Sequence, residues 1–272
     1  MRGIPASLLL SGMLLASGGG VQAAPCEPAG GFDAWRNDFR REALAAGISQ
    51  ATVSAAFSAV GYDLKVIDRD RNQKAFAQPF ETFFRRVISL NRLETAGRMM
   101  EQHSATLARI EQEFGVPPGV IVAIWGLESD FGAKLGKAHT IRALASLAYD
   151  CRRTDLFQGE LLAALQIVDR GDLTPGQMHG GWAGELGQTQ FLPSAYLRFA
   201  IDYDGDGRRD LLHSIPDVLA STANFLKGRG WKPQQPWMPG DPNFAVLLNW
   251  NQNEVYARTI AAFAARLDRG NK

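Results

Sequence analysis

The sequence predicts a mainly α-helical protein in which strand makes only a small contribution. The first supporting observation is that apolar residues recur at three- and four-residue intervals over most of the chain. The second is that helix boundary signals flank these segments, such as Gly47 and Gly115 after two of them and Pro117-Pro118 before a third. The chain has 272 residues, of which 46% are hydrophobic and 21% are charged. This composition is ordinary for a soluble globular protein with one large domain or two small ones.

The apolar periodicity places most of the expected elements. In the first half of the chain we expect helices over residues 33–46, 49–60, 81–90 and 93–114, with a polar turn at 68–72. Another helix begins at Pro117-Pro118, carries an apolar run and ends at Gly132. In the second half we expect helices over residues 140–149, 154–170, 194–201, 214–228 and 254–267. Residues 171–190 are rich in glycine, and residues 244–250 are expected to form the one strand.

The first 24 residues have the layout of a secretory signal peptide. Met1-Arg2 is a short basic start, residues 4–16 form an apolar run without an acid, and small residues lead to Ala23 and Ala24. The apolar run is too short for a stable membrane anchor. The sequence therefore predicts export, with cleavage near Ala23 or Ala24, and a mature chain from about residue 25 to residue 272 without a transmembrane segment.

The two cysteines bear on the state of the exported chain. With two cysteines in the chain, Cys26–Cys151 is the one intramolecular pairing available, so a disulfide is expected in an oxidising compartment. The alternative is two buried free thiols. A lipid anchor on Cys26 is disfavoured, because Pro25 stands where such sites usually have a small residue.

Charge and histidine spacing exclude two classes of protein. The chain has 29 Lys and Arg residues and 28 Asp and Glu residues, and loss of Arg2 with the leader leaves 28 of each. Because it has no basic stripe, we do not expect it to bind nucleic acid. The four histidines do not have the spacing of zinc ligands; they are His103, His139, His179 and His213.

One carboxylate lies at the end of a strongly apolar segment. In IVAIWGLESDFG (121–132), Glu128 shares a helix face with Ile121, Ile124 and Trp125. Burial and the negative end of the helix dipole both disfavour the charged form, so both raise the pKa of Glu128. A carboxylic acid that keeps its proton near neutral pH is what a general acid for glycosidic-bond cleavage requires. The structural alternatives are a carboxylate neutralised by an arginine or by backbone amides, and an exposed residue at a helix end.

The segment GGWAGELGQTQFLPSAY (180–196) combines glycines with amide and aromatic side chains. Glycines allow a ligand to approach the backbone closely. Gln188 and Gln190 can bind the hydroxyl and acetamido groups of a sugar, and Trp182, Phe191 and Tyr196 offer flat apolar faces for sugar rings. Taken alone, such a segment is also typical of an ordinary loop.

The segment DYDGDGRRD (202–210) has the pattern of the first part of an EF-hand calcium loop, with Gly207 at the sharp turn. His213 stands where a glutamate should complete the loop, so Asp217 would have to reach back in its place. The alternatives are a solvated turn and a helix-capping role for Asp217 after Ser214. The candidate ligands of a structural calcium ion are Asp202, Asp204, Asp206, the carbonyl of Arg208, Asp210 and Asp217.

Three segments together carry a family resemblance. WGLESDFG, then GELGQTQFLPSAY, then DYDGDGRRDL with VLASTANFLKGRGW are similar, in order and spacing, to the lytic murein transglycosylase B family. The resemblance implies a lysozyme-like core over about residues 111–230, with an additional helical lobe formed by about residues 32–110 and the C-terminal helices. It also implies cleavage of the β-1,4 bond between N-acetylmuramic acid and N-acetylglucosamine in peptidoglycan. No water is added, because the muramic C6 hydroxyl attacks the anomeric carbon and leaves a 1,6-anhydro ring.

The resemblance also assigns roles to single residues. Glu128 matches the family's glutamate, which acts alone as general acid and then as general base. Gln190 matches a glutamine that contacts the sugar, and Asn251 and Tyr256 in NWNQNEVY match two residues that line the same groove. With the two aromatic residues of the glycine-rich segment, the expected substrate-binding residues are Gln190, Tyr196, Asn251, Tyr256 and Trp182.

Two positions depart from the family pattern. Some members have a serine nine positions before the matched glutamine, and that position here is Gly181. Another donor or a water would then have to tune Glu128. Glu185 stands where a small residue is common, and a carboxylate at a helix start is favoured over a second chemical carboxylate.

Three functions are weighed on this basis. The favoured one is a periplasmic lytic transglycosylase that acts on peptidoglycan strands, needs no cofactor for its chemistry, and joins cell-wall synthesis or remodelling complexes. The second is a hydrolytic muramidase of the same fold, with Glu185 or Asp130 as the base that activates water. The third is a non-catalytic, calcium-stabilised protein that binds murein, against which the presence of Glu128 argues.

Overall fold

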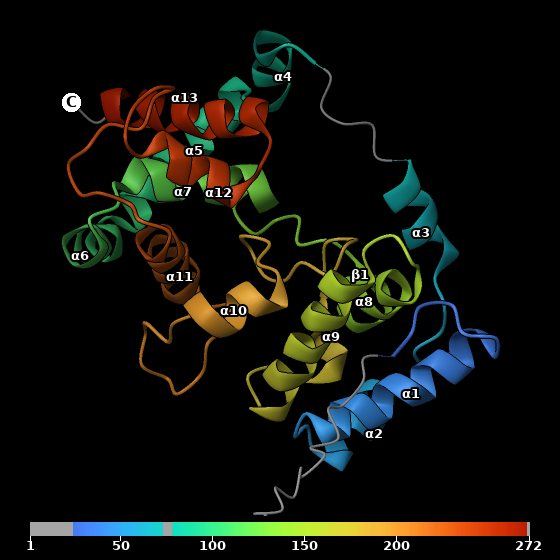
Figure 1. The fold of residues 1–272 in the computed structure, drawn as a ribbon. Helices are drawn as coiled ribbons and strands as arrows, with labels where there is room; N and C mark the ends of the chain where they lie inside the picture. Colours follow the sequence, from blue (N-terminus) through green and yellow to red (C-terminus); the bar gives the residue numbers. More distant parts are fainter. Residues whose placement is uncertain (1–23, 73–77, 271–272) are drawn as a thin grey trace, which may run out of the picture.

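A computed structural model describes residues 24–72 and 78–270, and within them the chain forms thirteen α-helices and one two-stranded sheet (Figure 1). The sheet pairs β1 (Ala138–His139) with β2 (His179–Gly180) in antiparallel register, with Ala138 opposite Gly180. A single 3-10 turn, Pro175–Gln177, precedes β2. The predicted helical class with little strand is therefore observed.

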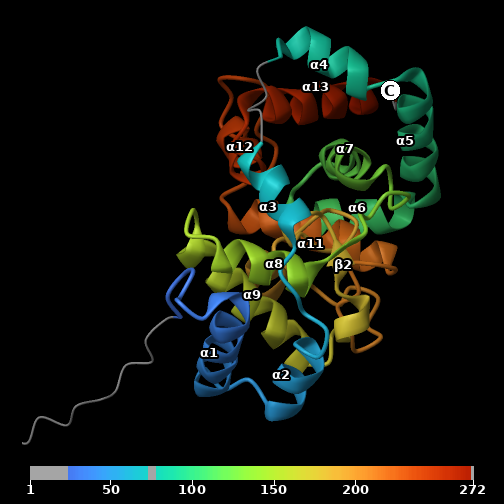
Figure 2. The ribbon, with the colours of Figure 1, turned by 90° about the vertical axis from the view of Figure 1, so that its right-hand side faces the viewer.

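The N-terminal helices pack on the middle of the chain. α1 (Gly31–Ala45) and α3 (Leu64–Arg71) contact α8 (Thr140–Tyr149), and α2 (Gln50–Ala56) contacts α9 (Thr154–Asp169). α8 and α9 also pack against each other, so these five helices form one half of the molecule; in Figure 2, α1, α2, α8 and α9 lie in the lower part and α3 lies above α8.

The other half is built around α7 (Pro118–Ser129). Four helices pack against α7: α5 (Leu90–Gln102), α6 (Ser104–Phe114), α11 (Ile215–Gly228) and α13 (Glu254–Gly270). Three shorter helices complete the fold, because α4 (Phe80–Val87) and α12 (Phe244–Trp250) contact α13, and α10 (Pro193–Phe199) bridges α9 and α11. The residues expected to form one helical lobe, about 32–110, thus lie in two groups on different halves (Figure 1).

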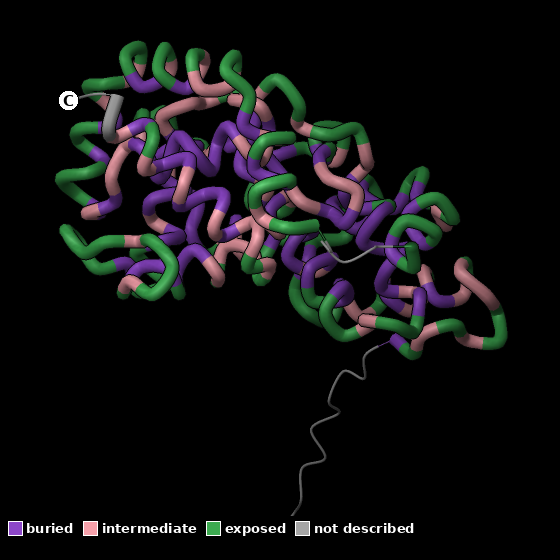
Figure 3. The backbone as a smooth tube through the Cα atoms, turned by 90° about the horizontal axis from the view of Figure 1, so that it is seen from above, coloured by how far each residue is buried: buried purple, intermediate pink, exposed green. Residues whose placement is uncertain are grey.

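Buried backbone runs through the centre of both halves (Figure 3). Trp35 and Phe39 of α1 have no exposed surface and stack at 5.3 Å between ring centroids in the first half. In the second half α7 is buried on nearly every side, from Gly119 to Gly126. A helix that is apolar all round is expected at the centre of a bundle, and that is where α7 lies.

Three sequence-based element predictions are wrong. Residues 244–250 form helix α12 instead of a strand, because a short apolar run fits either element and the packing of α12 against α11 and α13 decides the outcome. The polar turn expected at 68–72 lies mostly within α3. The single helix expected over 93–114 is two helices that meet at His103, and each keeps its own buried face.

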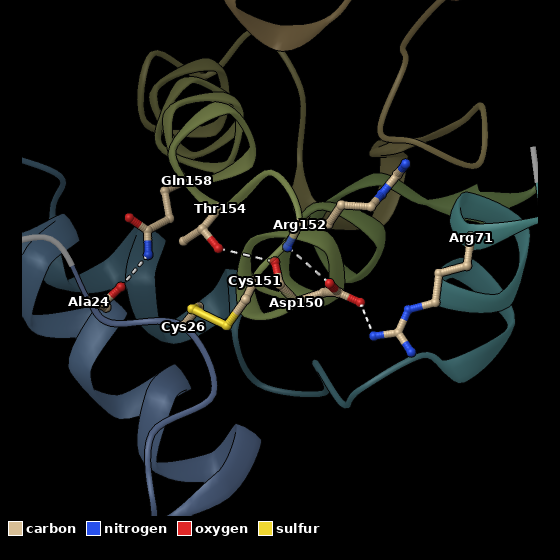
Figure 4. The surroundings of a disulfide bond; sticks show 8 residues. All are labelled: Ala24, Cys26, Arg71, Asp150, Cys151, Arg152, Thr154 and Gln158. Carbon is tan, nitrogen blue, oxygen red and sulfur yellow. Dashed lines mark hydrogen bonds and ion pairs between the residues drawn. A yellow bond between two sulfur atoms is a disulfide. The ribbon is translucent and has the colours of Figure 1, made fainter.

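A disulfide joins Cys26 to Cys151, with 5.2 Å between their Cα atoms, which confirms the expected pairing (Figure 4). It ties the N-terminal segment to the connection between α8 and α9. Asp150, next to Cys151, accepts a hydrogen bond from Arg71 of α3 at 2.7 Å. Asp70 of α3 is 2% exposed and forms ion pairs with Arg152 and Arg153. The same connection therefore holds both the N-terminal segment and α3.

The predicted leader, residues 1–24, lies outside the described residues except for Ala24. Ala24 is buried, its N–H donates to Glu42 at 2.9 Å, and its carbonyl accepts a hydrogen bond from Gln158 (Figure 4). Among the helices of residues 24–72 and 78–270, none combines the length and the apolar character needed to cross a membrane.

Candidate active site

A groove of about 950 Å³ lies between the two halves, and Glu128 is part of its lining. α3 contributes Arg69, the loop after β2 contributes Trp182 and Glu185, and the end of α12 contributes Trp250. The groove is therefore built from segments that are far apart in the sequence. Its other lining residues include Lys134, Lys137, Arg153, Phe157, Glu160, Gln190, Phe191, Arg229 and Asn251.

Helix α7 delivers Glu128 to this groove. The helix starts with Pro118 in its first turn and ends at Ser129, three residues before the expected stop at Gly132. Asp130 and Phe131 both have positive φ, at 56° and 59°, so the chain turns sharply directly after Ser129. The Phe131 ring then folds back edge-on against Trp125, with 5.5 Å between ring centroids. The catalytic candidate is thus held in the last turn of a rigid, buried helix.

The carboxylate of Glu128 receives two hydrogen bonds from neutral donors on one oxygen. Oε1 accepts from the indole N–H of Trp250 at 2.8 Å and from the hydroxyl of Tyr256 at 2.9 Å. Burial raises the pKa of Glu128 to about 7, the two hydrogen bonds oppose that rise, and the charge of Glu185 adds to it. No hydrogen bond reaches Oε2 from any residue that the structure describes, so this oxygen is free to meet a substrate.

The arginine-neutralised alternative for Glu128 is not observed. Within residues 24–72 and 78–270 no Lys, Arg or His forms an ion pair with it. Asp130 has that role instead, because it pairs with Arg92 at 3.1 Å and Lys134 at 2.9 Å. Its hydrogen bonds to Lys134 and Arg92 lower the pKa of Asp130. Asp130 is therefore a turn residue held by ion pairs.

The two glutamines of the glycine-rich segment have different roles. Gln188 is buried, accepts from Trp125 Nε1 at 2.7 Å and donates to the Leu212 carbonyl at 2.9 Å, so it joins the loop to α7 and does not face a sugar. Gln190 lines the groove, and its Nε2 donates to the carbonyls of Leu135 and Gly187 at 3.1 and 2.8 Å. These bonds fix the Gln190 side chain with Oε1 as its remaining acceptor.

The other expected substrate contacts are placed as follows. Trp182 is half-buried in the groove lining, with the Arg69 guanidinium 5.5 Å from its ring centroid. Asn251 also lines the groove. Tyr256 contacts Glu128, a lining residue of the groove, through the hydrogen bond that its hydroxyl donates. The expectation for Tyr196 is wrong, because this residue has no exposed surface and its hydroxyl donates to the Arg209 carbonyl inside the core.

Trp250 is the site residue that sequence reasoning missed. It directly precedes Asn251 in NWNQNEVY, so it lies within a segment already matched to the groove. Its pairing with Glu128 spans 122 positions of sequence, and no local pattern indicates it. The one available signal for Trp250 was its position next to Asn251, a predicted groove residue.

Glu185 is not at a helix start, contrary to expectation. It lies in the loop between β2 and α10, lines the groove, and its Oε2 accepts from the Ala183 N–H at 2.9 Å. Burial raises the pKa of Glu185, while backbone hydrogen bonds and the charges of Arg69 and Arg153 act in the opposite direction. A second carboxylate is therefore present in the same groove as Glu128.

The aspartate loop brings together part of the expected metal site. Carboxylate oxygens of Asp202, Asp204 and Asp217 lie within 4.8 Å of one another. Asp217 is fully buried and does reach back, since its two oxygens accept from the amides of Tyr203 at 2.7 Å and Asp210 at 2.8 Å. The Asp217 N–H also donates to the Ser214 hydroxyl, so the helix-capping arrangement is observed as well.

Asp206 and Asp210 are not part of this cluster. The carboxylate of Asp210 is turned toward His213, whose Nδ1 lies 3.0 Å from Oδ2. Asp206 uses Oδ1 to accept from the Arg208 N–H at 2.8 Å. A set of close carboxylates with a buried member is chemically suited to a hard cation such as calcium.

Comparison with known proteins gives consistent relatives. Residues 31–241 match the family model described as Transglycosylase SLT domain. A stretch of 131 residues is 38% identical to the Escherichia coli membrane-bound lytic murein transglycosylase B, and it covers 48% of this chain and 36% of that protein. The chain therefore aligns with about a third of the length of this relative.

Solved structures agree with the family match. The Pseudomonas aeruginosa SltB3 structure in complex with NAG-NAM-pentapeptide has a TM-score of 0.84 and 31% identity, and covers 89% of this chain and 80% of that chain. The E. coli Slt35 structure in complex with calcium shares the fold, with a TM-score of 0.77, 22% identity, and 86% and 93% of the two chains covered. These matches confirm the predicted helical, lysozyme-like fold class. Because the family model matches most of the chain, the protein belongs to the transglycosylase SLT domain family.

Proposed function

We propose that this protein is a lytic transglycosylase that cleaves the β-1,4 bond between N-acetylmuramic acid and N-acetylglucosamine in peptidoglycan. The observation that carries the proposal is the state of Glu128, whose pKa is raised to about 7 at the wall of a groove and whose Oε2 faces no protein donor. The matched SltB3 structure holds NAG-NAM-pentapeptide, which supports a glycan of this class as the ligand.

The chemistry needs one carboxylic acid. Glu128 donates its proton to the glycosidic oxygen as the bond from that oxygen to the anomeric carbon breaks. The muramic C6 hydroxyl then forms the new bond to the anomeric carbon and returns its proton to Glu128. A group that acts first as acid and then as base works best with a pKa near the working pH. Trp250 and Tyr256 stabilise the carboxylate form through Oε1, which favours the first step, in which Glu128 gives up its proton.

Hydrolysis by the same groove is the competing reaction. Asp130 is not suited to activate water, because Arg92 and Lys134 already pair with it. Glu185, the other base considered for hydrolysis, lines the groove. The two reactions differ in their products, since hydrolysis leaves reducing muramic ends and transglycosylation leaves 1,6-anhydro ends.

Substitution of Glu128 tests the proposal. Glu128→Gln keeps the shape of the side chain and removes the proton donor, so release of soluble fragments from purified peptidoglycan should fall by about 100-fold or more. Glu101→Gln, on the exposed surface of α5, is the matched control and should retain full activity. A Glu128→Gln protein with wild-type activity would refute the role of Glu128.

Export to the periplasm is the second part of the proposal, and Ala24 supports one cleavage position. Its N–H bonds to the Glu42 carboxylate and its carbonyl to Gln158, so a mature chain that begins at Ala24 keeps both contacts. A free amino group there would add a charge to the bond with Glu42. Intact-mass measurement of the protein from the periplasmic fraction should give a chain that starts at Ala24. A full-length chain in the cytoplasmic fraction would contradict export.

A structural calcium ion is the third part. Asp202, Asp204 and Asp217 would hold the ion, which would neutralise carboxylates that otherwise repel and so brace the loop between α10 and α11. Calcium should raise the melting temperature of the chelator-treated protein, and Asp217→Asn should remove the response. Equal melting temperatures with chelator and with calcium would contradict a structural calcium site.

A further inference from the structure

Gly181 and Glu185 are in direct spatial contact in the loop that follows β2. The Gly181 N–H donates to the Glu185 carbonyl at 3.0 Å, and the Gly184 N–H donates to the Gly181 carbonyl at 3.3 Å. Leu186 and Phe191 then exchange two backbone hydrogen bonds at 2.7 and 2.8 Å. These bonds fix the backbone on both sides of Glu185, so its carboxylate has a defined place in the groove wall.

The space next to Gly181 is filled by that carboxylate. A Cβ atom at position 181 would overlap with Oε2 of Glu185 and would lie 2.8 Å from Oε1 of Gln190. Gly181 does not have the left-handed φ that would itself require glycine. Its missing side chain is therefore what admits the Glu185 carboxylate to this part of the groove.

The Glu185 carboxylate is fixed but not neutralised by a close cation. It accepts the Ala183 N–H at 2.9 Å, and no ion pair involves it among the residues of 24–72 and 78–270. Arg153 is paired with Asp70, and Arg69 lies over the Trp182 ring. A half-buried carboxylate thus faces the groove that also contains Glu128.

We propose that Glu185 is a positioning residue for the general acid: a negative charge that Gly181 admits to the groove wall and that keeps Glu128 protonated before the glycosidic bond breaks. The inference rests on the proposed role of Glu128. A nearby negative charge disfavours ionisation of a second carboxylic acid, most strongly where water is excluded. The charge of Glu185 raises the pKa of Glu128, in addition to the larger effect of burial.

The other charges near the groove set the background for this effect. Positive charges near the groove favour ionisation of Glu128 and so oppose the effect of Glu185 on its protonation. The Glu160 carboxylate accepts hydrogen bonds from the amide and the hydroxyl of Ser194. The titratable and charged groups that face the groove or contact Glu128 are Arg69, Lys134, Lys137, Arg153, Glu160, Glu185, Arg229 and Tyr256. None of the others is substituted when Glu185 alone is changed, so the comparison alters one charge.

Glu185→Gln tests the charge without removing the side chain. In the profile of kcat/KM against pH, the alkaline limb reports loss of the proton from the general acid. Removal of a negative charge lowers the pKa of Glu128, so this limb should move to lower pH in Glu185→Gln. Glu101→Gln, which changes an exposed carboxylate on α5, should leave the limb where it is.

A double-mutant cycle tests the link between Gly181 and Glu185. Gly181→Ala should displace the Glu185 carboxylate and also move the limb to lower pH, whereas the same change in a Glu185→Ala background should cause no further shift. A purely structural role predicts a lower kcat in each variant with an unmoved limb, and that result would overturn the inference. If Gly181→Ala lowers the melting temperature too far for assay, Glu185→Gln alone decides.

Failure of this inference can be told from failure of the proposed function. An inactive Glu128→Gln protein together with an unmoved limb in Glu185→Gln removes the role of Glu185 and leaves that of Glu128. An active Glu128→Gln protein removes both.

Discussion

Glu128 and the hydroxyl of Tyr256 form a pair whose disruption has a predictable direction. The hydrogen bond from Tyr256 stabilises the charged carboxylate and lowers the pKa of Glu128. Tyr256→Phe should therefore raise the pKa of Glu128 and move the alkaline limb of kcat/KM to higher pH, opposite to Glu185→Gln. Loss of a hydrogen bond to a charged group, worth about 1.5–3 kcal/mol, should lower kcat by roughly 10- to 160-fold.

The measurement is the pH profile of Tyr256→Phe beside that of the wild type. The phenylalanine ring preserves the contact with Phe83, whose ring centroid lies 6.3 Å from that of Tyr256, so packing is retained. A limb that moves to lower pH, or a profile equal to the wild type, would show that the hydroxyl does not act on Glu128.

Single site residues were predictable where a local misfit marked them. Glu128 stands out as one carboxylate in an apolar helix, and burial is indeed the main cause of its raised pKa. Tyr196 was misjudged because the sequence shows that an aromatic ring is present but not whether it points to solvent or to the core. Trp250 was missed because its contact with Glu128 depends on how α12 and α13 pack on α7.

At the scale of elements, long periodic segments were predictable and short ones were not. Residues 140–149 form α8 with the expected bounds, and α9 and α11 agree within one residue at each end. The seven residues of α12 fail as a predicted strand, because only contact with α13 and α11 distinguishes the two conformations. Tertiary packing decides short apolar segments, and a single sequence does not display it.

The disulfide gives a prediction at this scale. The bond closes a loop of 125 residues between the N-terminal segment and the connection from α8 to α9, which restricts the unfolded chain. Replacement of both cysteines by serine should lower the free energy of unfolding by about 2–4 kcal/mol. For a chain of this size that corresponds to a fall in melting temperature of roughly 4–16 °C.

Thermal unfolding followed by circular dichroism, with and without a reductant, measures this effect. The wild type should lose stability in the reductant, while the double serine variant should be insensitive to it. A wild-type melting temperature that is the same under both conditions would contradict a stabilising role for the bond.

At the scale of the whole molecule, the groove exists because two halves of the chain meet. α3 supplies Arg69 on one side, with Arg153 just before α9, and α7 with α12 supplies Glu128 and Trp250 on the other. The family was predictable from three motifs, since each motif is local, and the general-acid role of Glu128 stays a prediction. The division of residues 32–110 between both halves was not, because it depends on which later helices each segment packs against.

The central claim is that Glu128 cleaves a glycan without adding water. Purified peptidoglycan should be digested with the mature protein, and the glycan ends of the products should be identified by mass spectrometry, with Glu128→Gln as the matched control. We predict 1,6-anhydromuramic acid ends from the wild type and none above background from the variant. Products with reducing muramic ends, heavier by one water, would contradict the account.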